Sequence, residues 1–188
     1  PKTRPGLLVG GADRLDTLAG LFSVGLAPSG TKDPFALRRA ALGLVQSLAG
    51  WDLDFDLRLG LRQAAAHLPQ RFDADELGEC ISFVIERLRN LLLEQGYRYD
   101  VVDAVLAAQG HNPAGAYRAA KELTAWVNRP DWDTILPAYA RCVRITRDIR
   151  EIYEVLPEAF VDPAEEALCQ AVRNARAAER RPGSVDDF

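Results

Sequence analysis

Apolar residues along most of the chain recur every three or four positions, which is the spacing of helices that bury one face. A first helix is predicted from six such residues: Leu7, Leu8, Leu15, Leu18, Leu21 and Phe22. A second helix is predicted from Asp33 and Pro34 to about Leu48, because an aspartate caps a helix start and a proline is tolerated in the first turn. Gly50 follows as a stop signal.

The segment 51–62, WDLDFDLRLGLR, alternates apolar and polar residues with the period of a half-buried strand. No other segment of the chain alternates as well, and an unpaired strand leaves its backbone groups without partners. We therefore predict a helix here instead. It begins at Asp54 or Asp56 and reaches His67, and Pro69 ends it.

The strongest helical pattern runs from a cap at Asp73 or Asp75 to a stop at Gly96. Seven apolar residues keep helical spacing within it: Leu77, Ile81, Val84, Ile85, Leu88, Leu91 and Leu92. Two shorter helices are predicted after it, over about 100–109 and 113–128.

The last part of the chain is predicted to hold two more helices beyond a hinge at 129–131. Helical spacing from Ile135 to Tyr153 predicts a long helix, and a final helix is predicted to start after Asp162 and Pro163. No segment repeats at a fixed period. The predicted fold class is therefore all-α.

Composition and charge narrow the classes of function. The 188 residues, 48% of them apolar, are enough to bury a core, and the net charge of −4 argues against a generic cationic nucleic-acid binder. The window 29–50 is an exception, because it carries Lys32, Arg38 and Arg39 against Asp33 alone. No apolar run reaches the roughly 20 residues that span a bilayer, and the cysteines form no C-x-x-C pair. We expect no membrane association and a cytoplasmic location.

Candidate catalytic chemistry is sparse. Asp13 and Asp16 lie three residues apart on one predicted helix, within reach of a shared cation, although a solvated or capping role is the simpler interpretation of such a pair. The two histidines, His67 and His111, are interpreted as structural or exposed, and neither is followed by an aspartate. We predict no catalytic residue and no metal site in this chain.

Four arginines recur every three residues in the predicted long helix: Arg141, Arg144, Arg147 and Arg150. Their spacing suits a strip that faces RNA. The last three also have a carboxylate four residues further on, and such pairs contribute about 0.2–0.5 kcal/mol each on solvated helices. Salt-bridged pairs are the simpler interpretation, and Arg141 is then the least neutralised of the four.

Three blocks of the chain resemble one family, in the order in which that family has them. Residues 12–44, ADRLDTLAGLFSVGLAPSGTKDPFALRRAALGL, resemble the most distinctive block of the β subunit of bacterial glycyl-tRNA synthetases, whether heterotetrameric or fused. Residues 83–107, FVIERLRNLLLEQGYRYDVVDAVLA, resemble the helical segment that follows there. Residues 136–149, LPAYARCVRITRDI, resemble the opening helix of the family's anticodon-binding domain.

The resemblance implies a domain organisation. Residues 1–70 are expected to be the C-terminal part of an HD-like domain, 71–128 a helical linker or body region, and 129–188 a partial anticodon-binding domain. The A-D-R-L stretch resembles the closing helix of HD-type phosphohydrolases, which makes Asp13 and Asp16 vestigial metal-ligand candidates. In the family this domain has lost metal-dependent hydrolysis and helps to hold the acceptor arm of tRNA.

The resemblance also implies partners and roles. The expected partners are tRNA(Gly) and the α subunit, or a fused α part, which holds the glycine site and uses ATP and Mg; no cofactor is expected in this chain. Lys32, Arg38 and Arg39 become candidates for phosphate contacts, and Arg141 a weaker one. The chain is expected to be a fragment that does not aminoacylate tRNA alone.

Two other functions stay open from the residues. The first is an HD-type metal-dependent phosphohydrolase. The second is a purely structural helical scaffold, in which Arg38 and Arg39 would be tied to acidic residues.

Overall fold

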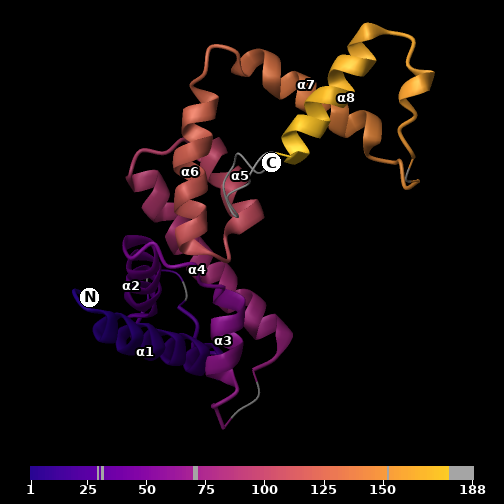
Figure 1. Ribbon diagram of the computed structural model, residues 1–188. Coiled ribbons are helices and arrows are strands. Elements are labelled where there is room, and N and C mark those ends of the chain that lie inside the picture. Colours follow the sequence, from indigo (N-terminus) through magenta and orange to yellow (C-terminus); the bar gives the residue numbers. More distant parts are fainter. Residues whose placement is uncertain (29, 31, 70–71, 152, 178–188) are drawn as a thin grey trace. The chain divides into compact units, whose positions relative to one another are not determined.

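The computed structural model describes residues 1–28, 30, 32–69, 72–151 and 153–177. These residues form eight α-helices and one short 3₁₀ helix, without a β-strand, which confirms the predicted all-α class (Figure 1). None of the helices they form is long and apolar enough to cross a membrane. The chain divides into two compact units, Pro1–Ala125 and Trp126–Phe188, which are described separately.

Four helices build the core of the first unit. They are α1 (Arg4–Phe22), α2 (Leu37–Gly50), α3 (Leu57–Ala65) and α4 (Ala74–Glu94). Helix α1 packs on the other three, and α4 also packs on α2 and α3 (Figure 1). Leu18, Leu44 and Leu88 are buried where these helices meet, as their helical spacing predicted.

Helix α2 begins at Leu37, so the predicted start at Asp33 and Pro34 is wrong. The reason is local: Ala36 has a φ of 55°, in the left-handed region, and this turn separates Pro34 from the helix. Asp33 nevertheless caps α2 from outside. Its carboxylate accepts hydrogen bonds from the backbone N–H of Leu37 at 2.8 Å and of Arg38 at 3.0 Å.

Part of segment 51–62, which alternates like a strand, forms helix α3. Asp56 caps it by accepting from the backbone N–H of Arg58 and Leu59, which confirms the predicted helix; it ends at Ala65, before the predicted end at His67. Leu57 and Leu61, four residues apart, are both fully buried. The hydrogen bond from Arg58 lowers the pKa of the Asp56 carboxyl to about 2.

Helix α4 starts and stops where its local signals predicted. Asp73 accepts from the backbone N–H of Glu76, whose own carboxylate accepts from the N–H of Asp73, a reciprocal capping box. At the other end Gly96 has a φ of 90°, which a glycine adopts without steric cost.

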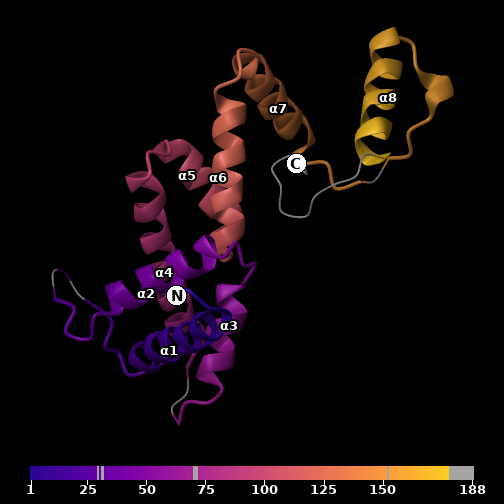
Figure 2. The ribbon, with the colours of Figure 1, turned by 60° about the vertical axis from the view of Figure 1, so that its left-hand side comes forward.

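Helix α5 (Tyr99–Gln109) packs on α4, and α6 (Pro113–Val127) follows it in the chain (Figure 2). Both agree with the predicted ranges to within a residue. Helix α5 buries three valines, and the residues that α6 buries in its first two turns are all small: Pro113, Ala114, Gly115, Ala116, Ala119 and Ala120.

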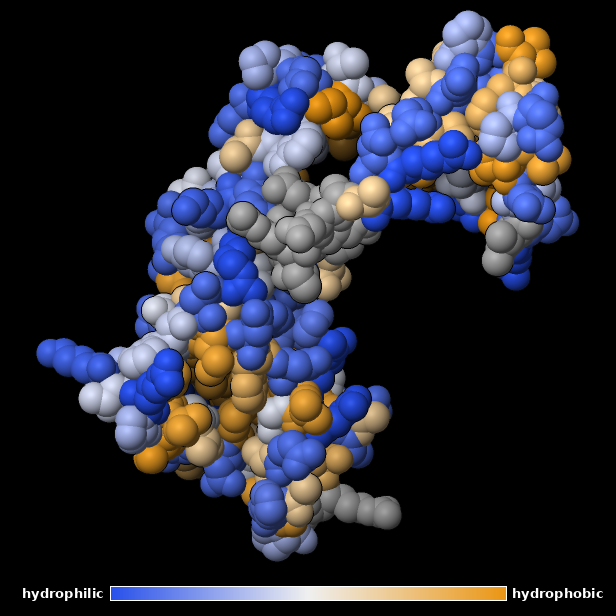
Figure 3. Space-filling model, in the orientation of Figure 1, coloured by the Kyte–Doolittle hydropathy of each residue, from blue (hydrophilic) through white to orange (hydrophobic). Residues whose placement is uncertain are grey.

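The second unit holds α7 (Trp132–Thr146), the 3₁₀ helix η1 (Pro157–Ala159) and α8 (Pro163–Ala177). None of its described residues is buried, and apolar side chains such as Leu168 and Val161 are exposed. Figure 3 shows hydrophobic residues on the surface of this unit. Helix α8 starts after Asp162 and Pro163 as predicted.

The predicted continuation of α7 to Tyr153 is wrong, because the helix ends at Thr146. Ile149 and Tyr153, whose spacing favoured a longer helix, are 49% and 69% exposed. Most helical stability in proteins comes from packing an apolar face, and these residues have no core to pack on.

The cysteines offer a test of this division between a packed and an open unit. Burial raises the pKa of the Cys80 thiol in α4 to about 12, whereas Cys142 in α7 is exposed. Because the thiolate is the reactive form, we expect a thiol reagent at about pH 8 to label Cys142 rapidly and to leave Cys80 unmodified until the chain is unfolded. Replacing Cys142 by serine should remove the fast phase and leave the slower labelling of the half-buried Cys169. Labelling of Cys80 in the folded chain at the rate of Cys142 would contradict the structure.

Candidate nucleic-acid interface

Three predicted cations gather where the chain enters α2. Lys32, Arg38 and Arg39 form what we call the basic patch. The Arg38 guanidinium donates to the backbone carbonyls of Gly30 at 2.5 Å and Lys32 at 3.4 Å. The side chain of Arg38 therefore fastens the loop that carries Lys32 to the first turn of α2.

The other two cations of the basic patch face solvent. Lys32 and Arg39 are exposed, and the described residues place no carboxylate in an ion pair with either of them or with Arg38. By contrast, Arg58 and Arg89 in the same unit each pair with an aspartate at 2.8 Å. The ties to acidic residues that a purely structural scaffold would require are absent from this part of the structure.

Arg141 belongs to the second unit, whereas the basic patch belongs to the first. It is exposed on α7. The helical pairs predicted beyond it are wrong: α7 ends at Thr146, so Arg147 and Arg150 do not sit one helical turn from their acidic partners. Among the described residues of this segment no ion pair forms.

Asp13 and Asp16 line an open groove between α1 and α3, with a volume of about 980 Å³. The groove also contains His67, which the sequence analysis considered separately, together with apolar residues such as Phe55 and Leu59. No group of three or more histidine, cysteine, aspartate or glutamate side chains is arranged to hold a metal ion in the part of the chain that the structure describes.

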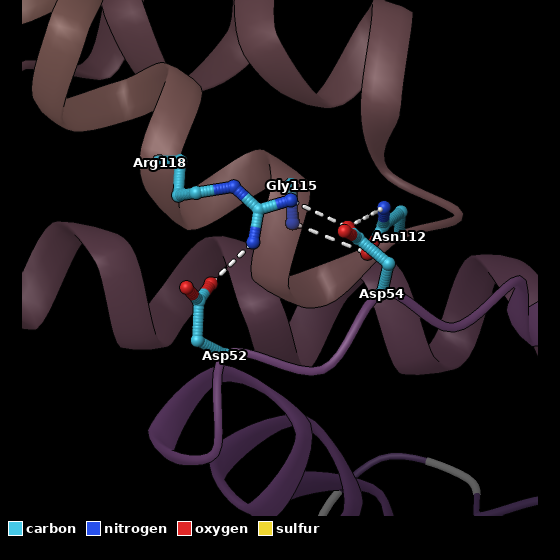
Figure 4. A network of polar contacts seen from close by, with 5 residues as sticks. All are labelled: Asp52, Asp54, Asn112, Gly115 and Arg118. Atoms are coloured by element: carbon cyan, nitrogen blue, oxygen red, sulfur yellow. Dashed lines mark hydrogen bonds and ion pairs between the residues drawn. The ribbon is translucent and has the colours of Figure 1, made fainter. Parts of the chain in front are cut away.

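A polar network that no sequence pattern indicates joins α6 to the loop between α2 and α3 (Figure 4). Arg118 of α6 forms ion pairs with Asp52 and Asp54 of that loop. Asn112 donates to Asp54 at 2.7 Å and accepts from the backbone N–H of Gly115 at 3.1 Å. The partners lie 58 to 66 positions apart in the chain, so no local pattern signals them.

This network fixes the C-terminal end of α2. Asp52 has a φ of 47°, in the left-handed region, where the chain turns away from the helix. The hydrogen bond from Asn112, and after it the one from Arg118, hold the pKa of the Asp54 carboxyl below its ordinary value. The backbone N–H of Leu57 also donates to the carbonyl of His111 at 2.9 Å, which gives this histidine a structural position.

Comparison with known proteins gives one consistent result. The family model described as "Glycyl-tRNA synthetase beta subunit" matches residues 1–107. The chain is 37% identical over 183 residues to the glycine--tRNA ligase beta subunit of Moorella thermoacetica, covering 94% of this chain and 26% of that protein. It is 36% identical over 190 residues to glycine--tRNA ligase, chloroplastic/mitochondrial 2, of Arabidopsis thaliana, covering 100% of this chain and 18% of that protein. The chain thus spans about a quarter or less of the length of these relatives.

The polar network predicts a pH-dependent stability. Arg118→Gln removes both ion pairs, and we expect the free energy of unfolding at about pH 7 to fall by about 1 kcal/mol, since exposed pairs contribute roughly 0.2–1 kcal/mol each. Because the folded-state pKa of Asp54 is lowered from 3.8, its contribution is complete above that value and is lost as the pH falls through the folded pKa. Urea unfolding of the native chain and the variant at about pH 7 and pH 3 measures the loss of unfolding free energy and its dependence on pH.

Lys121→Gln, which removes an exposed cation from the same helix, is the matched control. Its effect should be small at both pH values. If Arg118→Gln destabilises the chain equally at about pH 7 and pH 3, the ion pair with Asp54 is not what the residue contributes.

Proposed function

Because the chain belongs to the family of glycyl-tRNA synthetase β subunits, we propose that it is a tRNA-binding portion of that enzyme. In this proposal it supports the ATP-dependent attachment of glycine to tRNA(Gly). The reaction takes place at an active site in an α subunit or fused α part, which also uses the ATP and Mg. The chain itself contributes no catalytic residue, forms no glycyl-tRNA alone and works in the cytoplasm.

The proposal rests on the exposure of Lys32 and Arg39 in the basic patch and on their lack of ion-pair partners among the described residues. Lys32 and Arg39 present cationic groups to solvent, without an ion-pair partner among the described residues, beside an α2 segment that contains no aspartate or glutamate. Cations that a fold does not neutralise internally are available to phosphates, which dominate the affinity of RNA-binding proteins. Arg38 supports this surface by fastening the loop that carries Lys32.

The proposal gives each part of the chain a role. Residues 1–70 are the C-terminal part of an HD-like domain that holds the acceptor arm, and 71–128 form the helical region that supports it. Residues 129–188 are part of an anticodon-binding domain, with Arg141 as a second, weaker contact. No described residue of the second unit is buried, which supports the proposal that this part packs against other protein segments or RNA.

Replacing both exposed cations of the basic patch tests the proposal. We expect Lys32→Gln/Arg39→Gln to weaken binding of a labelled tRNA(Gly) transcript and to flatten its salt dependence, because each phosphate contact contributes a slope of about 0.7–0.9. With one phosphate contact each from Lys32, Arg38 and Arg39, the native chain should lose roughly 20- to 40-fold in affinity between about 50 and 200 mM salt. Fluorescence anisotropy over a salt series measures both quantities.

Arg62→Gln/Lys121→Gln serves as the control, because it removes the same charge from exposed positions on α3 and α6. A general electrostatic effect would weaken both double variants equally. That result, or a flat salt profile for the native chain, would refute the patch as the tRNA-binding surface.

A further inference from the structure

A fourth cation lies between α1 and α2, apart from the basic patch. The guanidinium of Arg14 donates to the backbone carbonyl of Gly10 at 2.5 Å and rests against Gly43 of α2. A Cβ at Gly43 would come within 2.7 Å of Arg14 Nε, and one at Gly10 within 2.8 Å of its Nη1. The two glycines therefore leave the space that this guanidinium occupies.

Arg14 lines a polar cavity of about 400 Å³ on the surface of the first unit. The residues around the cavity are Pro1, Arg14, Gly43, Gln46, Ser47, Gly50 and Trp51. Arg14 is half-buried, and within the described ranges no carboxylate pairs with it. The half-buried Trp51 is held in place by a hydrogen bond from its Nε1 to the carbonyl of Pro1 at 3.1 Å.

The cavity and the basic patch share helix α2. Arg39, Gly43, Gln46 and Gly50 are spaced by four, three and four residues, so they lie along one stripe of α2. Arg39 therefore stands about one turn, or about 6 Å along the axis, from the glycine against which Arg14 rests.

We infer that this cavity is an RNA subsite in which Arg14 binds a backbone phosphate and Trp51 stacks on an unpaired base. A guanidinium keeps several donors after its bond to Gly10, and it suits the geometry of a phosphate. An indole face stacks on any base, but only where the base is unpaired, because bases in a duplex are already stacked on one another. The inference rests on the proposed function and names a single-stranded segment of the RNA as the ligand at this end of α2.

Gly43→Ala is the sharpest variant, because its new methyl group displaces the flexible Arg14 side chain while alanine favours the helix. We expect tRNA(Gly) affinity to fall about tenfold, as for loss of one charge-assisted hydrogen bond, and the salt slope to fall by about 0.7–0.9. Gly78→Ala in α4 is the matched control, since a Cβ there meets nothing within 4 Å. Arg14→Gln should repeat the effect of Gly43→Ala.

Stacking is tested with Trp51→Ala, and Tyr99→Ala, which removes an exposed aromatic side chain from α5, is its control. We expect Trp51→Ala to weaken binding of a short single-stranded RNA about tenfold and to leave binding of a blunt duplex of the same sequence unchanged. Equal losses on both RNAs would refute stacking on an unpaired base.

The outcomes separate this inference from the proposed function. If the native chain binds tRNA and Lys32→Gln/Arg39→Gln weakens it, while Gly43→Ala, Arg14→Gln and Trp51→Ala bind normally, the subsite is wrong and the function stands. If the native chain binds no RNA, both are overturned.

Discussion

The buried face of α2, packed against α1 and α4, orients Arg38 and Arg39, and the hydrogen bonds of Arg38 hold the loop that carries Lys32. Leu37, Ala41, Leu44, Val45 and Leu48 are all buried, so the remaining face of the helix must be turned to solvent. That free face carries Arg39 at its start and the polar cavity beside Arg14 further along. Both ends of α2 are held from outside, by Asp33 at the N-terminus and through the Arg118 network at the C-terminus. A shift of this one helix would move the basic patch and the cavity together.

The cations of the first unit fall into two groups: those that form ion pairs within the fold and those that do not. Arg58, Arg89 and Arg118 meet aspartates and serve the structure, whereas Lys32 and Arg39 do not. A net charge of −4 for the whole chain does not forbid a local phosphate contact, because charges more than about 8 Å apart are largely screened at physiological ionic strength. An acidic protein can therefore carry an RNA surface, provided that its carboxylates are used elsewhere.

The two units differ in how much of their structure they stabilise alone. The first has a core of leucines and valines, while the described residues of the second bury none of their side chains. Tyr139 and Leu168 are examples of apolar residues of the second unit that are more than 60% exposed. Covering this apolar surface would lower the free energy. The basic patch and the Arg14 cavity therefore rest on the part of the chain with its own core.

The sequence by itself determined the all-α class and most helix boundaries, because caps and stops act over a few residues. Asp56, Asp73 and Gly96 sit where their local chemistry predicted. The left-handed turn at Ala36 and the early end of α7 escaped prediction, since the first is a single backbone conformation and the second reflects missing packing. Only the tertiary structure decided that Asp13 and Asp16 share a groove with His67, that Arg118 reaches Asp54, and that Arg14 fits against Gly43. Those contacts join residues far apart in the chain, and their partners are set by how helices pack.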